Sequence, residues 1–573
     1  MSYLLFFAKV KNCFLKGREF FAQERLYPLY TFLFFMSFFL LSYMTLDRVF
    51  SLDDGFFHIR FAELFREQGM GAFTHFQSIY FSRMAIGQEY FVYYSFLFYI
   101  ALVPFTLITP LVLGMKMYGV VALSISFTMV YIFLRGVAMR YAFLWTLLFL
   151  LILMQSGWLF RFTLARPFTL APVFLLLMLH CIHKKKHLLS GVIAFLYFYW
   201  HTATFIFPLC LALGYFLFEQ FYGKKPDWKM ILLPFVATLS AVLVAYLISP
   251  GVIAYLRDVI FPVFFDTALT KETGIAEGGE VYGRNIFTTL NAFFWFIAGL
   301  FILGSYEIVR YIRSKRGVLE SEDALDMSIQ PLRSMLFMAS LVFLVATTLS
   351  GRFLDYFVYF AFLYMVIAVT DISKFINIKE GIFKSSFFIG SLVVAIFLFG
   401  SLSLNFYDSL AGSSTQISSQ GTADWLNSHL EAGKILLNVD WSAFPSLYYF
   451  TGDKFRYTTG LEPRFLYDLD PKMYWIWNGI GSGIYCEQSD CSEIVKQRKE
   501  SLANEANKKN WYEFQGNKIA DATLHIFQTD IILTSTGRKD LLDVMDHSTR
   551  FKKEFFDDKN SAYAIYRVVE MNE

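Results

Sequence analysis

Long apolar segments recur along the first 404 residues and then stop. Most of them run for roughly 17–25 residues, which is enough for a helix to cross about 30 Å of hydrocarbon. The pattern therefore predicts a membrane domain over residues 1–404, built from transmembrane helices. The apolar segments lie near residues 28–46, 92–109, 112–134, 139–157, 167–182, 188–200, 203–221, 230–249, 287–304, 334–350, 353–371 and 385–404.

The remaining residues, 405–573, carry polar and charged side chains at an ordinary soluble density. A Ser-rich linker over 413–421 precedes a predicted helix at 422–431 and a buried strand at 434–440, a pattern typical of an α/β domain. The sequence thus predicts an α-helical polytopic membrane domain followed by a soluble α/β domain. The first segment lacks a small-residue cleavage site and is expected to be a retained helix.

Composition narrows the class of protein. Of the 573 residues, 56% are hydrophobic and 17% charged, against roughly 25% charged in soluble domains. Disorder and a single soluble domain are therefore excluded. The 50 basic and 47 acidic residues nearly cancel, so bulk binding to nucleic acid is not expected.

The basic loops predict the orientation, because Lys and Arg in short loops favour the cytoplasm. All of them fall on the inner side if about eleven segments cross and 92–109, which contains Pro104, is a re-entrant or surface element. The alternative is that 92–109 crosses and another segment does not. The outer face then holds the loops 47–91 and 250–286 and the C-terminal domain. The basic loops are Lys9–Arg25, Arg135–Arg140, His183–His187, Lys224–Lys229, Arg310–Arg316 and Lys374–Lys384.

Two adjacent acids, Asp53 and Asp54, open the first outer loop, and His58 and Arg60 follow them. A carboxylate at a membrane boundary can act as a base or bind a cation. Asp54 and His58 share a face if a helix covers 55–67. The alternative is that one of the acids caps this helix.

The stretch from Asp54 to Arg60, directly after the first membrane segment, resembles the start of GT-C glycosyltransferases, and is most similar to the oligosaccharyltransferase catalytic subunits. The resemblance implies 11–13 helices, a long first outer loop and an outer C-terminal domain. It implies that Asp54 is an essential carboxylate, with Asp53 and His58 as further catalytic candidates. It covers the layout of the whole chain but is specific over short stretches only.

Two arginines, Arg161 and Arg166, lie at a predicted outer membrane edge, where forked hydrogen bonds could hold a donor phosphate. The competing interpretation is snorkelling to the interface. Arg60 and Arg352 are further candidate phosphate ligands. Arg352 and Asp355 could instead form a structural pair. The family has a second acidic pair near such arginines, which this sequence lacks.

Glu277 lies in a glycine-containing stretch of the loop 250–286 and resembles the Glu of the Thr-Ile-x-Glu element of oligosaccharyltransferases. The resemblance implies that Glu277 and Asp54 could hold a divalent metal, Mg or Mn. A solvated loop is the alternative for this stretch.

In the α/β domain, Trp441 and Tyr448 follow the predicted strand, at the place of the acceptor-reading motif of that family, although the residues do not match it. They are candidate acceptor contacts. Cys486 and Cys491 bracket a polar loop, and a disulfide between them is expected if the domain is outside the cytoplasm.

These features predict an integral, multi-pass membrane glycosyltransferase, in the cytoplasmic membrane if the source is bacterial. Its donor would be a polyprenyl-linked sugar, and its acceptor a glycan, a lipid or a protein. Besides these substrates, membrane lipids are the expected partners. The alternatives are a lipid or glycan transporter or flippase, or a non-catalytic glycan-binding membrane protein. The absence of a recognisable repeat disfavours the transporter.

Overall fold

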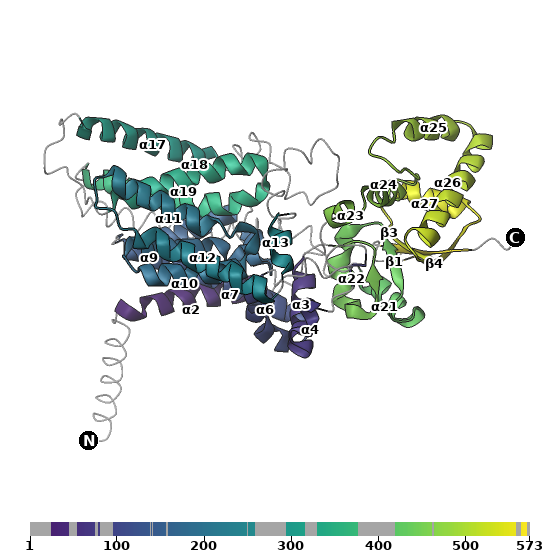
Figure 1. Cartoon of the computed structure of the whole chain (residues 1–573), viewed down its shortest axis with the longest axis horizontal. Helices are drawn as coiled ribbons and strands as arrows, with labels where there is room; N and C mark the ends of the chain where they lie inside the picture. Colours follow the sequence, from purple (N-terminus) through teal and green to yellow (C-terminus); the bar gives the residue numbers. More distant parts are fainter. Residues whose placement is uncertain are drawn as a thin grey trace, which may run out of the picture.

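The computed structural model describes residues 24–44, 54–74, 78–80, 95–137, 139, 141–155, 159–248, 250–257, 294–315, 329–375, 419–460, 463–556 and 563–569. A bundle of helices makes up one end of the molecule and a mixed α/β region the other (Figure 1). The boundary expected at residues 404 and 405 lies outside the described residues.

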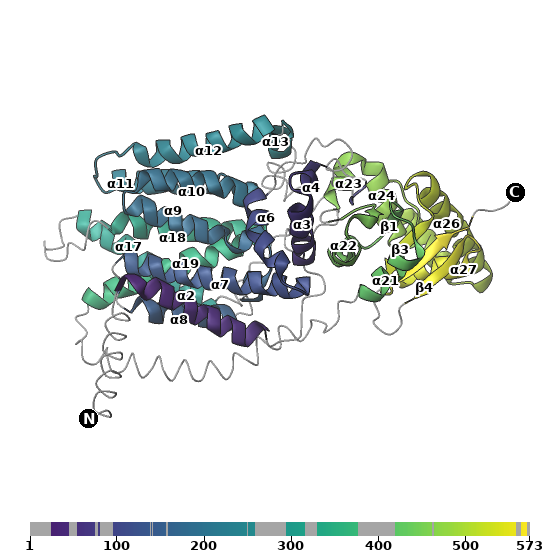
Figure 2. The same ribbon diagram turned by 90° about the horizontal axis from the view of Figure 1, so that it is seen from below.

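Within the described ranges, the bundle contains ten helices that run side by side (Figure 2). They are α2 (Tyr27–Phe39), α7 (Leu111–Gly136), α8 (Ala142–Gln155), α9 (Ala171–His183), α10 (His187–Trp200), α11 (Phe207–Phe221), α12 (Lys229–Ile248), α17 (Phe294–Lys315), α18 (Gln330–Leu349) and α19 (Leu354–Phe375). Between them and the α/β region lie α3 (Gly55–Gln68) and the short helices α4 (Gly71–Thr74), α6 (Phe96–Leu102) and α13 (Gly251–Tyr255).

The chain is an integral, multi-pass membrane protein, because six of the described helical stretches are long and apolar enough to cross a membrane. Five further apolar stretches have 10–17 residues, and at 1.5 Å per residue none of these stretches alone reaches about 30 Å. One of them, Phe296–Tyr306, is part of the 22-residue helix α17. The number of about eleven crossings therefore remains a prediction. The six stretches are Glu24–Ser42, Leu111–Gly136, Thr202–Phe221, Lys229–Ile248, Gln330–Thr348 and Gly351–Asp371.

The segment expected to be irregular, 92–109, is broken in its described part. Helix α6 ends at Leu102, and the 3-10 helix η3 (Val103–Leu107) with Pro104 in its first turn continues it. Together they form one of the shorter apolar helices, Phe96–Leu107. Its length fits an element that does not cross the membrane fully.

The α/β region is built on a five-stranded sheet of order β2-β1-β3-β5-β4. Strands β1, β2 and β3 are parallel, and β5 pairs antiparallel with both β3 and β4. The strands are β1 (Ile435–Asn438), β2 (Arg456–Tyr457), β3 (Ile531–Ser535), β4 (Phe551–Phe556) and β5 (Tyr563–Val568). The helices are α21 (Gln420–His429), α22 (Phe444–Thr451), α23 (Arg464–Leu469), α24 (Pro471–Ile480), α25 (Ser492–Leu502), α26 (Glu505–His525) and α27 (Lys539–His547). The predicted helix and strand at the start of this region are thus confirmed as α21 and β1.

Part of the segment 47–91, predicted to be the first outer loop, contacts the α/β region. Its residue Ile79 forms a parallel bridge with Tyr457, so that the loop extends the sheet beyond β2. The amide of Tyr457 donates to the carbonyl of Ser78, and the amide of Tyr80 donates to the carbonyl of Tyr457, both at 2.7 Å. One continuous apolar core also runs from the bundle through α3 to α22 and one face of the sheet. The loop that begins at Asp54 therefore depends on the α/β region for its position.

Candidate functional site

Asp54 lies directly before the first turn of α3, and its side chain makes no capping hydrogen bond. Its carboxylate Oδ2 instead lies 3.3 Å from an Nη of Arg166, which comes from the turn between α8 and α9. The side chain of Asp54 is 34% exposed and that of Arg166 13% exposed. The predicted helix at 55–67 is confirmed as α3, whereas the alternative of a capping role for the Asp54 side chain is wrong. Asp53 lies outside the described residues.

His58 follows Asp54 by one helical turn and is buried. Its Nδ1 is 2.9 Å from the hydroxyl of Tyr99, and its ring meets Phe98 edge-on. Burial, together with the nearby charge of Arg166, lowers the pKa of His58 to about 3. The imidazole is therefore neutral at physiological pH and suits a positioning role better than proton exchange.

Arg161 and Arg166 flank one ring, that of Phe168, with their guanidinium carbons 5.1 and 5.7 Å from its centroid. Arg161, however, forms a two-pronged ion pair with Asp355, in which Nε and Nη2 each lie 3.0 Å from a carboxylate oxygen. The side chains are only 4% and 1% exposed. The charge of Arg161 is therefore balanced within the protein, whereas Arg166 stands beside the more exposed Asp54.

Asp355, one option for a structural pair with Arg352, pairs with Arg161, a residue 194 positions away in the chain. Arg352 is exposed on the 3-10 helix η9 (Gly351–Phe353). Burial of His201 is the main cause that lowers its pKa to about 3, and the nearby charge of Arg352 adds to this effect. Nδ1 of His201 lies 2.6 Å from Thr204 Oγ1, so His201 is a hydrogen-bonded residue at a helix end.

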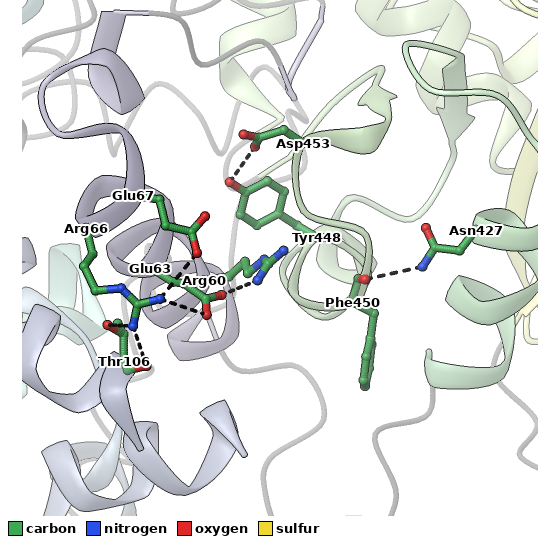
Figure 3. A network of polar contacts seen from close by, with 9 residues as sticks. All are labelled: Arg60, Glu63, Arg66, Glu67, Thr106, Asn427, Tyr448, Phe450 and Asp453. Atoms are coloured by element: carbon green, nitrogen blue, oxygen red, sulfur yellow. Dashed lines mark hydrogen bonds and ion pairs between the residues drawn. The ribbon is translucent and has the colours of Figure 1, made fainter. Parts of the chain in front are cut away.

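Arg60 belongs to the junction of α3 with the α/β region (Figure 3). It pairs with Glu63 on its own helix, and its guanidinium is so close to Gly452 that a Cβ at 452 would lie 2.8 Å from it. Arg66 on the same helix donates to the carbonyl and hydroxyl oxygens of Thr106, at 2.9 and 3.0 Å. Arg60 is thus turned toward α22, and its role as a phosphate ligand stays a prediction.

Tyr448 is fully buried in α22 and fills the contact between the two regions. Its ring centroid lies 5.4 Å from that of Phe57 and 5.5 Å from that of Phe444. Its hydroxyl donates a hydrogen bond to Asp453 at 2.9 Å. Burial raises the pKa of Tyr448 well above its usual value. This placement does not favour the expected acceptor contact, because the side chain is enclosed by protein.

Trp441 is only partly buried, in the 3-10 helix η10 (Trp441–Ala443) that follows β1. The preceding residue, Asp440, accepts hydrogen bonds from the amide of Ser535 at 2.7 Å and from Nε of Arg538 at 2.9 Å. These bonds tie the end of β1 to the end of β3. Trp441 therefore remains a candidate acceptor contact on a rigid support.

The expected metal site of Asp54 and Glu277 falls partly outside the described residues, because Glu277 is not among them. Within the described ranges, no group of three or more His, Cys, Asp or Glu side chains gathers in a way that could hold a metal ion. The one charged group paired with Asp54 there is a cation, Arg166. The described part of this site, Asp54 beside the cation Arg166, does not fit a metal ion.

Cys486 and Cys491 are joined by a disulfide, with their Cα atoms 6.1 Å apart. It closes the loop between α24 and α25. Sequence reasoning missed Phe168 as the ring between the two arginines and Tyr99 as the partner of His58. The aromatic residues of 92–109 could have been searched for partners of the first outer loop.

The chain is similar in fold to solved structures, whereas the two sequence comparisons found no match. No family model matches the chain, and no curated protein matches it. Among solved structures, it is similar to the crystal structure of ArnT from Cupriavidus metallidurans bound to undecaprenyl phosphate, with a TM-score of 0.49 and 9% sequence identity. The match covers 93% of this chain and 97% of that one. Chains this distant can share an arrangement of elements without sharing a reaction.

Proposed function

We propose that this protein is a membrane glycosyltransferase that moves a sugar or glycan from a polyprenyl-phosphate-linked donor to an acceptor on the outer face of the membrane. The observation that carries the proposal is the partly exposed Asp54–Arg166 pair, which joins the start of α3 to the turn between α8 and α9. A base and a cation adjacent to each other are what displacement of a phosphate from a sugar requires.

In the proposed reaction, Asp54 takes the proton of an acceptor hydroxyl or amine. The acceptor atom then attacks the anomeric carbon, and the bond from that carbon to the phosphate oxygen breaks. The polyprenyl phosphate leaves with the bonding electrons, and Arg166 stabilises its charge through charge-assisted hydrogen bonds. Direct displacement inverts the anomeric configuration.

The surroundings support this division of roles. The buried Arg161–Asp355 pair and the ring of Phe168 hold the turn that carries Arg166. The neutral His58 holds the first turn of α3 through Tyr99. In this proposal the α/β region lies outside the cytoplasm, where nucleotide sugars are absent and a lipid-linked donor is the natural source of activated sugar.

The test is Asp54→Asn in vesicles that contain the purified protein, polyprenyl-phosphate-linked sugars and candidate acceptors. We expect transfer to fall by about 10²–10⁴-fold, the usual contribution of a general base. Glu67→Gln is the matched control, because Glu67 is an exposed carboxylate on the same helix. Full transfer by the Asp54 variant would refute the mechanism. Movement of the donor across the membrane without transfer would favour a transporter.

A further inference from the structure

Two loops at the end of the bundle away from the α/β region are tied together by ion pairs (Figure 2). One connects α9 to α10, and the other connects α11 to α12. Nε2 of His187 lies 2.8 Å from Asp227, and Nζ of Lys185 lies 2.7 Å from Glu219. Glu219 is 1% exposed, so the two loops share a buried anchor.

The two loops contain more lysines than the carboxylates there can neutralise. Six lysines stand there against two carboxylates, Glu219 and Asp227. Lys185 and Lys224 both approach Glu219, at 2.7 and 3.6 Å. The other four lysines are exposed and form no ion pair within the described part of the chain: Lys184, Lys186, Lys225 and Lys229. We call these four the lysine cluster.

Large apolar side chains are exposed directly beside the lysine cluster. Trp228 is 65% exposed and is held by its ring contact with Phe216, at 5.0 Å between centroids. Leu188, in the first turn of α10, is 75% exposed. An indole between a basic loop and an apolar helix is typical of a membrane interface. The lysines therefore lie where the hydrocarbon ends and the headgroups begin.

From this edge an apolar stripe runs along α12. The opposite face of α12 packs on α10 and α11, whereas the stripe is exposed. Its members recur at helical spacing: Leu232, Phe235, Val236, Leu239 and Leu243. A phospholipid lying along the first half of the stripe would place its phosphate among the lysines.

We infer that the lysine cluster and the stripe of α12 form a binding surface for anionic phospholipids of the inner leaflet. The ammonium groups match a negatively charged headgroup, and the exposed indole and leucines match its acyl chains. An acidic protein could satisfy the charges, but it would leave Trp228 and Leu188 exposed to water. The inference does not depend on the proposed reaction, since the surface lies at the opposite end of the bundle.

The experiment uses the full chain in nanodiscs of phosphatidylcholine and phosphatidylglycerol, whose two faces are equivalent, so that orientation cannot affect the result. Spin-labelled lipids report the association of each lipid with the protein. We expect phosphatidylglycerol to associate at least about fivefold more strongly than phosphatidylcholine. This factor corresponds to the attraction between an anionic lipid and roughly one interfacial lysine. Variant K184Q/K186Q/K225Q/K229Q should reduce this ratio to near one.

The matched control is K496Q/K499Q/K509Q/K539Q, which removes four exposed lysines from the α/β region. It should keep the wild-type ratio. If the cluster variant does not fold, a salt titration of the wild type replaces it, because screening should abolish the preference. The inference is overturned by equal association of the two lipids with the wild type, or by a preference that survives the cluster variant. Binding of polyglutamate without a lipid preference would assign the surface to an acidic protein and overturn it equally.

Discussion

Arg161 and Arg166 stand in the same turn, against the same phenylalanine, and each faces a carboxylate, yet the two pairs differ in exposure. The Arg161–Asp355 pair is almost completely buried and its geometry is two-pronged. The Arg166–Asp54 pair is longer, and Asp54 is a third exposed. A buried arginine whose charge is fully paired cannot readily bind a ligand. A partly exposed arginine can replace its carboxylate partner with a phosphate. The comparison teaches that position along the chain does not separate structural from reactive arginines.

The largest expected effect comes from breaking the buried pair. Asp355→Asn leaves Arg161 charged and enclosed, which should cost about 3–5 kcal/mol of unfolding free energy. Thermal unfolding of the detergent-solubilised protein, followed by intrinsic fluorescence, measures the loss. The double change Arg161→Met with Asp355→Leu should recover most of it. An Asp355→Asn protein as stable as wild type would erase the difference between the two pairs.

Removing the positive charge of Arg166 should affect sugar transfer strongly and stability only weakly. Arg166→Gln should lower transfer by about 100-fold, the usual effect of losing one donor to a developing anion. The unfolding free energy should change by less than about 1 kcal/mol, because the pair is partly solvated. Transfer assays and thermal unfolding on one preparation separate the two effects. A large loss of stability with normal transfer would place Arg166 in the same class as Arg161.

Acid should weaken the site through His58. Its pKa is about 3 in the folded protein and near 6.5 when exposed, so the unfolded state binds more protons between these values. This contribution to stability is complete above pH 6.5 and declines as the pH falls toward 3. The loss of stability amounts to about 1.4 kcal/mol per pH unit below 6.5, or about 2 kcal/mol at pH 5. The melting temperature of His58→Gln should depend less on pH over this range; an unchanged slope would contradict the burial argument.

The smallest expected effect concerns the support of α3 by α22. Tyr448→Phe keeps the ring between Phe57 and Phe444 and removes only the hydrogen bond to Asp453. The expected loss is about 1 kcal/mol, with transfer within about threefold of wild type. Chemical unfolding and the transfer assay measure the two quantities. A transfer loss comparable to that of Arg166→Gln would show that the exposed pair depends on the hydroxyl of Tyr448 as well.

Local patterns predicted much of the layout. Helix α3 starts directly after Asp54, helix α21 and strand β1 open the α/β region, and the segment around Pro104 is broken. These features depend on apolar periodicity and proline chemistry, which act within a few residues of the chain. The lengths of the bundle helices were less predictable, because several predicted apolar segments form helices that are too short to cross a membrane alone.

The sequence by itself determined that this is a membrane protein with an α/β region, and that Asp54, Arg161 and Arg166 are charges in need of an explanation. Only the tertiary structure decided which charges pair. Asp355 reaches Arg161 across 194 positions, and Arg60 turns to α22 rather than to the bundle. Such pairings depend on the packing of distant helices, which decides whether a charge is enclosed or solvated. Because exposure is a property of the packed molecule, the fold alone separates Arg166 from Arg161.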